Sequence, residues 1–273
     1  MESAILLILI ALAQSLNLDT SGGPRTEVIS RTQLEPHSIS GPWSQVPWRL
    51  QSMPTSTRSG TELHYLRSEI VDLDLPPAQR WIGILSKYRE EVLPYFRHWQ
   101  QVFDTQIGIS QDALHDAVWE RTSPEWRAEL RGIVRAMNDP AVTLRFVTLL
   151  SGAIYDLGLV YGCSQLVAAA ADGTVLHGRS MDLFEVAPAV EVTFLRRGRV
   201  LFVSTMWLGH IGVHTAIKPG AWSFGSNTRY DARDNQLSAL ARLRAGSSIQ
   251  YFFVRELFQQ DLGYEEAVRA LRD

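Results

Sequence analysis

Cys163, the only cysteine of the chain, stands where the sequence changes from helix-type to strand-type patterns. Residues 70–160 before it contain long amphipathic or apolar runs, and residues 163–207 contain short alternating runs divided by glycine turns. Helices and strands that are segregated along a chain are typical of the α+β class. With one thiol and therefore no intrachain disulfide, such a fold must be stabilised by its apolar core alone.

Composition and the first residues limit the partners and the compartment. The 273 residues are 45% apolar with a formal net charge of −3, which gives no basic footprint for nucleic acid. The apolar run Ala4–Ala13 is too short to span a bilayer and indicates a secretory signal over residues 1–16. Glu2 stands where such signals usually carry a basic residue, so a buried apolar start is the alternative. Residues 17–68, rich in Ser, Thr, Gly and Pro, are expected to form a loose leader.

Residues 69–162 are predicted to be mainly helical after a short strand that Pro76 and Pro77 stop. A helix is expected from about Ala78 to Phe103, with Pro94 kinking or dividing it. Ser123-Pro124-Glu125 has the cap, proline and acid that start a helix. Asp139-Pro140 repeats this device before an apolar run, which predicts a buried core helix.

Two hairpins and further helices are predicted after the cysteine. The first hairpin is expected to turn at Asp172-Gly173 and the second at Arg197-Gly198. Amphipathic helices are expected over about Leu237–Gln260 and Tyr264–Arg272.

The first hairpin brings chemical groups toward Cys163. If Asp172 and Gly173 form a two-residue loop, Cys163 lies opposite Asp182. Strict alternation then puts Arg179 on the other face, and a bulge near Gly178 would return it to the face of Cys163. The spacing is therefore compatible with a Cys–Asp–Arg cluster.

Two readings of Cys163 remain open on these grounds. A free cysteine is commonly a small buried hydrophobe. Alternatively its thiolate is a nucleophile, and cutting the Gly162–Cys163 bond would supply an α-amine, with a usual pKa of about 8, as the base. A Cys–His dyad with His177, His210 or His214 is disfavoured because Cys163 opens a strand rather than a helix. The histidine spacing fits no usual zinc pattern, so neither a metal nor another cofactor is expected.

Three segments carry a family resemblance. C-S-Q-L-V, then D-G and H-G-R-S-M-D, resembles the start of the mature β-subunit in the acid ceramidase and N-acylethanolamine acid amidase family of N-terminal-nucleophile cysteine hydrolases. Arg179 and Asp182 lie at the family's distances after Cys163. LDLPPAQRW and GHIGVHTAIKPGAWSFGSNTR also resemble family segments. The chain departs from the family pattern at four positions, Ser164, Gln165, Ser180 and Thr228.

The resemblance implies a fold and a set of roles. The fold would be an αββα sandwich, incomplete at its C-terminus because the family continues further. Residues 69–162 would form a helical α-subunit and residues 163–273 the first part of the β-subunit, held together non-covalently after cleavage before Cys163. Cys163 would be the nucleophile and its α-amine the base, with Arg179 and Asp182 orienting them. Asn227 would be an oxyanion-hole donor.

The same resemblance implies a function and a place of action. The protein would be a secreted proenzyme, lysosomal or extracellular, that hydrolyses the amide bond of ceramide or an N-acylethanolamine at acidic pH. Transient contact with a membrane surface would deliver the lipid substrate. The alternatives are a catalytically dead lipid-binding form and an amidase for other N-acyl amides such as bile-salt conjugates.

Overall fold

The computed structural model describes ten stretches of the chain: residues 5–8, 30–31, 51–52, 55–56, 63–64, 66–154, 163–169, 175–182, 188–227 and 236–272. They divide into two compact units. Unit 1 comprises Met1–Arg67, Tyr161–Val186 and Gly225–Asn227, and unit 2 comprises Ser68–Val160, Ala187–Phe224 and Thr228–Asp273. The α+β class is confirmed, whereas the four-layered sandwich stays a prediction. Of the expected signal, the structure describes residues 5–8, which form strand β1, and most of the expected leader lies outside the described residues.

Unit 1 contains a small antiparallel sheet in the order β1-β8-β7. Its strands are β1 (Ile5–Ile8), β7 (Cys163–Ala169) and β8 (Val175–Asp182). Four further short strands pair as β2 (Ser30–Arg31) with β3 (Gln51–Ser52), and β4 (Thr55–Ser56) with β5 (Leu63–His64).

The main sheet has five strands in the order β12-β11-β10-β9-β6. They are β6 (Arg67–Asp72), β9 (Ala189–Arg196), β10 (Arg199–Trp207), β11 (Thr215–Lys218) and β12 (Trp222–Gly225). The predicted turn at Arg197-Gly198 is confirmed, because β9 ends before it and β10 follows it as an antiparallel partner. Both turn residues have positive φ, 52° and 68°, as a tight two-residue hairpin turn requires.

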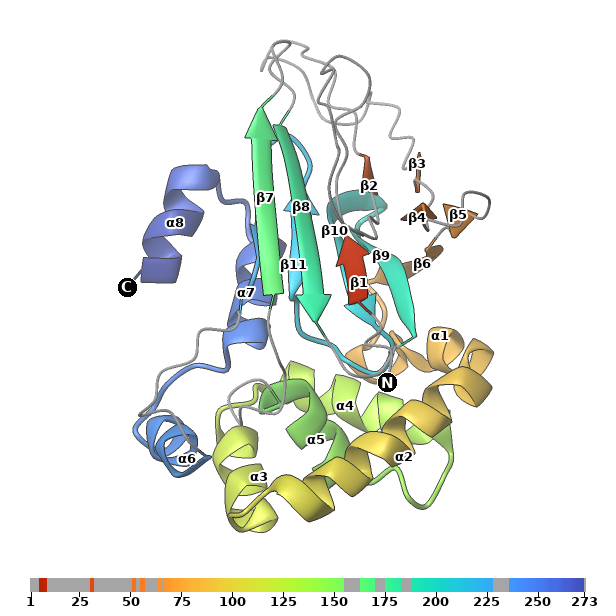
Figure 1. Ribbon diagram of the computed structural model, residues 1–273, viewed down its shortest axis with the longest axis vertical. Helices are drawn as coiled ribbons and strands as arrows, with labels where there is room; N and C mark the ends of the chain where they lie inside the picture. Colours follow the sequence, from red (N-terminus) through yellow and green to blue (C-terminus); the bar gives the residue numbers. More distant parts are fainter. Residues whose placement is uncertain are drawn as a thin grey trace, which may run out of the picture. The chain divides into compact units, whose positions relative to one another are not determined.

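The described residues from 70 to 154 are mainly helical, as predicted for this part of the chain. The helices and one 3₁₀ turn are η2 (Pro77–Gln79), α1 (Ile82–Lys87), α2 (Arg89–Gln106), α3 (Gln111–Glu120), α4 (Pro124–Met137), α5 (Leu144–Gly152), α6 (Gln236–Arg244), α7 (Gln250–Gln259) and α8 (Tyr264–Arg272). In unit 2, α1 to α5 gather at one end of the strands (Figure 1). The helix expected over residues 78–103 divides at Tyr88 rather than at Pro94, which α2 accommodates near its start. No helix in the described ranges has both the length and the apolar character needed to cross a membrane.

One of the two predicted helix starts is correct. The Ser123 hydroxyl accepts a hydrogen bond from Trp126 N at 3.3 Å and caps α4. The start at Asp139-Pro140 is wrong, because α5 begins at Leu144 with Thr143 as its cap. The Asp139 carboxylate instead accepts from Ala141 N at 2.9 Å, which closes a turn before the helix.

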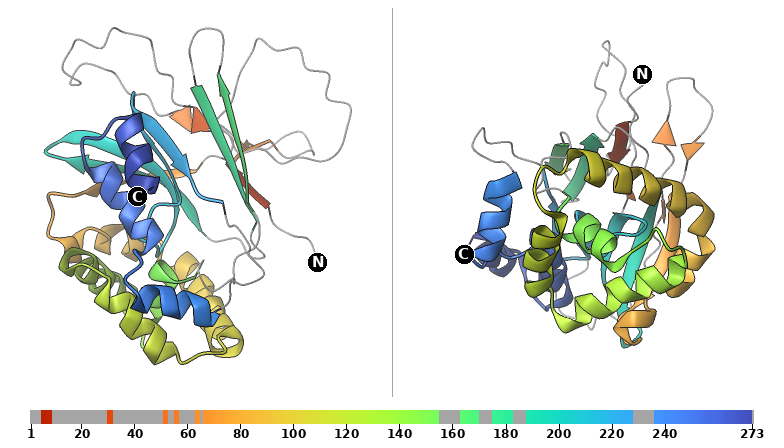
Figure 2. Two further views of the ribbon diagram at one scale, coloured as in Figure 1. Left: turned by 90° about the vertical axis from the view of Figure 1, so that its left-hand side faces the viewer. Right: turned by 90° about the horizontal axis from the view of Figure 1, so that it is seen from below.

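Helix α7 covers part of the main sheet (Figure 2). The ring of Phe258 lies 5.2 Å from that of Phe202 on β10 and 3.9 Å from that of Trp222 on β12. The predicted helix over residues 237–260 is divided into α6 and α7, and Gly246 between them has a φ of +106°. The last predicted helix is confirmed as α8.

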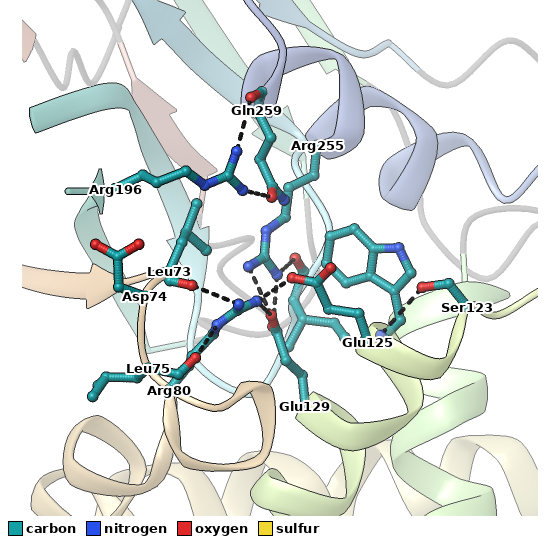
Figure 3. A network of polar contacts seen from close by, with 12 residues as sticks. Leu73, Asp74, Leu75, Arg80, Ser123, Glu125, Glu129, Arg196, Arg255 and Gln259 are labelled. Carbon is teal, nitrogen blue, oxygen red and sulfur yellow. Dashed lines mark hydrogen bonds and ion pairs between the residues drawn. The ribbon is translucent and has the colours of Figure 1, made fainter.

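A buried carboxylate joins the helices before Cys163 to α7 (Figure 3). Glu129 on α4 is 0% exposed and accepts from Arg80 at 2.7 Å and from Trp81 Nε1 at 2.6 Å. Arg255 on α7, also 0% exposed, donates to the two Glu129 oxygens at 2.7 and 3.0 Å. Its guanidinium lies 4.4 Å from the ring centre of Trp126. The helical segment and the C-terminal segment therefore share one charged core.

A buried histidine makes unit 2 sensitive to acid. His210 is 1% exposed, with its Nε2 2.9 Å from the Tyr95 hydroxyl and its ring 5.8 Å from that of His214. Burial lowers the pKa of His210 from the usual 6.5 to about 3. The unfolded chain binds a proton here below pH 6.5, so this stabilisation is complete above pH 6.5 and is lost as the pH falls toward 3.

Because the unfolded chain takes up a proton at His210, we expect the free energy of unfolding to fall by about 2 kcal/mol when the pH is lowered from 7 to 5. His210→Phe removes the titrating ring, so its free energy of unfolding should fall less over that range than that of the wild type. Urea unfolding of both proteins at pH 7 and pH 5 measures the difference. Equal losses in the two proteins would show that the proton uptake lies elsewhere.

Candidate functional site

The register of the first hairpin differs from the prediction by one residue. Cys163 pairs with Met181, not with Asp182, and Ala169 pairs with Val175. A two-residue turn at Asp172-Gly173 would pair Cys163 with Asp182, so the observed register contradicts that turn; residues 170–174 lie outside the described residues. The predicted bulge near Gly178 is also wrong, because the pairs run without interruption from Cys163 to Ala169.

This register places two of the candidate catalytic residues, Cys163 and Arg179, on one face without any bulge. Arg179 lies opposite Gln165, which is two residues after Cys163 and shares its face. Arg179 is 3% exposed, and its Nη2 donates to Cys163 Sγ at 3.3 Å. A guanidinium so placed stabilises negative charge on the sulfur. The predicted Cys–Arg pair is therefore formed in the structure, by a different geometry from the one expected.

Gln165 on β7 contacts Gly225, the last residue of β12, and Asn227, both of which belong to unit 1. Its Nε2 donates to Gly225 O and to Asn227 Oδ1, both at 2.7 Å. Its Oε1 lies 2.8 Å from His177 Nε2. Asn227 is exposed and Cys163 is half-buried, so both lie where solvent reaches them. Asn227 is thus hydrogen-bonded to a side chain that lies on the same strand face as Cys163.

Other predicted residues lie outside the described part. Asp182 ends β8, where its Cα pairs with Ile5, and its side chain is not among those described. Gly162 and Thr228 lie outside the described residues altogether. Across the described ranges, no three His, Cys, Asp or Glu side chains gather as metal ligands would.

Gln165 and His177 were not predicted as a pair. The sequence offers His177 as a candidate base for Cys163, but the side chain that reaches the sulfur is that of Arg179. Burial, then the charge of Arg179, lowers the pKa of His177. The available signal was the position of Gln165, two residues along a strand from the nucleophile and at a departure from the family pattern.

A close approach at Gly225 offers a test of this arrangement. A Cβ added there would lie 2.6 Å from Gln165 Oε1 and 3.2 Å from Arg179 Cδ, so both side chains would have to move. Gly225→Ala should slow alkylation of Cys163 by iodoacetamide roughly tenfold, as expected for losing about 1.5 kcal/mol of charge-assisted hydrogen bonding. Gly83→Ala is the matched control, because nothing lies within 4 Å of its added Cβ. Equal rates in the two variants would contradict the packing.

Known proteins resemble this chain over most of its length, although no family profile matches it. The N-acylethanolamine-hydrolyzing acid amidase of Caenorhabditis elegans is 28% identical over 217 residues, 73% of this chain and 58% of that protein. Acid ceramidase of Mus musculus is 24% identical over 230 residues, 74% and 56% of the two chains. Acid ceramidase of Homo sapiens is 22% identical over 297 residues, 99% and 68%.

The chain therefore spans a little more than half the length of the first two relatives. A solved structure of the Caenorhabditis elegans amidase ortholog is 23% identical, covers 40% of this chain and 47% of that one, and has a TM-score of 0.33, too low to bear on the fold. The sequence comparisons carry the assignment: the chain is a distant relative of the acid ceramidases and N-acylethanolamine-hydrolyzing acid amidases, at 22–28% identity.

Proposed function

We propose that the protein is an N-terminal-nucleophile cysteine amidase that cuts itself between Gly162 and Cys163. The observation that carries the proposal is the hydrogen bond from the buried Arg179 guanidinium to Cys163 Sγ at 3.3 Å. A structural cysteine has no need of a buried cation at its sulfur, whereas a nucleophilic thiolate is stabilised by one. The distant relationship to named amidases supports the same chemistry.

The reaction follows from a cysteine that starts a chain. Its α-amine takes the thiol proton, and Sγ bonds to the carbonyl carbon of the substrate amide. The carbonyl oxygen becomes an oxyanion, which N–H donors near the site stabilise. The C–N bond then breaks as the ammonium returns its proton to the leaving amine. Water hydrolyses the resulting thioester, which releases the fatty acid and restores the thiol.

We infer a lipid N-acyl amide as the substrate, either a ceramide or an N-acylethanolamine. The names of the relatives support these two classes. An acidic compartment of the secretory pathway fits the same relatives and the apolar run near the N-terminus. Asp182 is proposed to orient the α-amine and Asn227 to stabilise the oxyanion.

The two pieces are proposed to stay together after the cut, although no disulfide can join them. The charged core of unit 2 supports this, because Arg80 and Glu129 belong to the first piece and Arg255 to the second. Separation would leave buried charges without partners, which is costly. Strand β6 of the first piece also belongs to the five-stranded sheet with β9 to β12 of the second.

Acid incubation followed by intact-mass spectrometry tests the proposal. At pH 4–5 we expect a new fragment that starts at Cys163, together with fatty acid release from a panel of ceramides, N-acylethanolamines and bile-salt conjugates. The panel identifies the amine and the acyl chain. Lipid binding without hydrolysis would favour the catalytically dead form, and full activity in an uncut chain would refute the mechanism.

A further inference from the structure

We propose that Gln165 is a positioning residue, which holds Asn227 by its oxygen and so turns the Asn227 nitrogen away from Gln165, where it can donate to a substrate oxygen. This inference rests on the proposed amidase function and assigns a role to a residue at which the chain departs from its family. Among the described residues, the polar contacts of Gln165 are with Gly225, Asn227 and His177 rather than with Cys163.

A backbone carbonyl fixes the orientation of the Gln165 amide. Gly225 O can only accept a hydrogen bond, so the Gln165 atom 2.7 Å from it must be the nitrogen. The other end of the amide is then the oxygen, which lies 2.8 Å from His177 Nε2. An amide oxygen only accepts, so His177 Nε2 carries a hydrogen. Both ends of the Gln165 amide are therefore assigned without reference to Asn227.

The orientation of Asn227 follows from that of Gln165. The Gln165 nitrogen has two hydrogens, one for Gly225 O and one for the Asn227 atom 2.7 Å away. That atom must accept, so it is Oδ1. The Asn227 nitrogen and its two hydrogens consequently face away from Gln165. Stabilising an oxyanion requires that the Asn227 nitrogen, and not its oxygen, face the substrate. An amide rotated the other way would present an oxygen to a developing negative charge.

His177 is the first donor in a series of hydrogen bonds that all run the same way, from His177 to Gln165 to Asn227. Nε2–H donates to Gln165, and Gln165 donates to Asn227, so each bond polarises the next. Protonating His177 would preserve this direction, because both nitrogens of a charged imidazole are donors. In the described part of the chain, the charged group that acts on His177 is Arg179 on the same strand face, which also contacts Cys163 Sγ. Acid therefore leaves the amide of Asn227 in place.

Gln165→Glu tests the proposal through its dependence on pH. A glutamate has nearly the same shape as glutamine, but an ionised carboxylate only accepts hydrogen bonds. The Asn227 amide must then rotate to donate to it, which turns the Asn227 oxygen toward the substrate. At pH 6–7 we expect kcat relative to wild type to fall about 10²- to 10³-fold with little change in KM, as for loss of an oxyanion donor. Protonated glutamic acid regains one O–H donor, for which Asn227 Oδ1 and Gly225 O compete, so the ratio should rise in part as the pH falls toward about 4.

Gln165→Met is the matched control, since it fills similar space and never donates. Its kcat ratio should stay low at every pH. A ratio for Gln165→Glu that does not change with pH, or a Gln165→Met variant with wild-type kcat, would overturn the positioning role. A purely structural role for Gln165 would lower the melting temperature of both variants without this pH-dependent recovery.

A second measurement does not depend on activity. In the uncut Cys163→Ala protein, NMR should show both Gln165 carboxamide protons exchanging with solvent at least about tenfold more slowly than those of exposed Gln101, because each is hydrogen-bonded. In Asn227→Leu one of the two should become fast. Fast exchange of both in the parent would overturn the arrangement. Slow exchange of the Gln165 carboxamide protons, together with no amide hydrolysis by the wild-type protein, would contradict the proposed function but agree with the hydrogen-bond arrangement.

Discussion

Cys163→Ala should leave the chain whole after acid incubation and lower amide hydrolysis by more than about 10⁴-fold, as removal of a catalytic nucleophile does. The same sulfur is needed twice, first to attack the bond before its own residue and then to attack the substrate. Intact-mass spectrometry measures the first event and fatty acid release measures the second. Both should fail together in this variant.

Cys163→Ser is the informative companion, because it retains a nucleophilic oxygen that Arg179 can still contact. Slow self-cleavage with weak turnover in this variant would agree with the mechanism. The melting temperatures of both variants should stay near that of the wild type, because Cys163 is only half-buried. Undiminished turnover by Cys163→Ala would mean that the sulfur is a bystander.

Glu129→Ala should destabilise the protein by about 3–5 kcal/mol, the usual cost of breaking a buried ion pair from one side. The substitution strands Arg255, which is 0% exposed, and removes a partner from Arg80 and from Trp81 Nε1. Domains of ordinary stability unfold with about 5–15 kcal/mol, so this loss brings the fold close to its limit. Urea unfolding at pH 7 measures it.

Two further variants separate the buried pair from general damage to α4. Glu125 also pairs with Arg80, but its side chain is 45% exposed, so Glu125→Ala should cost less than about 1 kcal/mol. Glu129→Leu combined with Arg255→Met removes both charges and should be more stable than Glu129→Leu alone. If the double variant lost as much free energy of unfolding as the two single variants together, or more, the result would contradict a coupled pair.

The sequence predicted that Arg179 meets Cys163, but not the register that brings the two together. Side chains alternate along a strand, so a register shifted by one residue would put Arg179 on the other face from Cys163. Asp172-Gly173 favours a two-residue turn, and no local signal in the sequence reveals the one-residue shift of register that the strands adopt. At Arg197-Gly198 the tight turn did form, because both residues adopt positive φ.

Other features were set by contacts between distant residues. Thr143 and Asp139 are both good caps, and packing of the apolar run selected Thr143. Gln165 meets Gly225 and Asn227 from 60 and 62 residues away, so neither partner is evident from its neighbours in the chain. The same holds for Glu129 and Arg255, which share no local pattern.

The separation of Glu129 and Arg255 bears on how the protein is made. Arg255 is synthesised 126 residues after Glu129, so the helices leave the ribosome long before the cation that neutralises their buried acid. Until then Glu129 must remain solvated or form an ion pair with Arg80 alone. Nascent chains stalled before residue 255 should consequently be held by chaperones or degraded, and the core should close only near the end of translation.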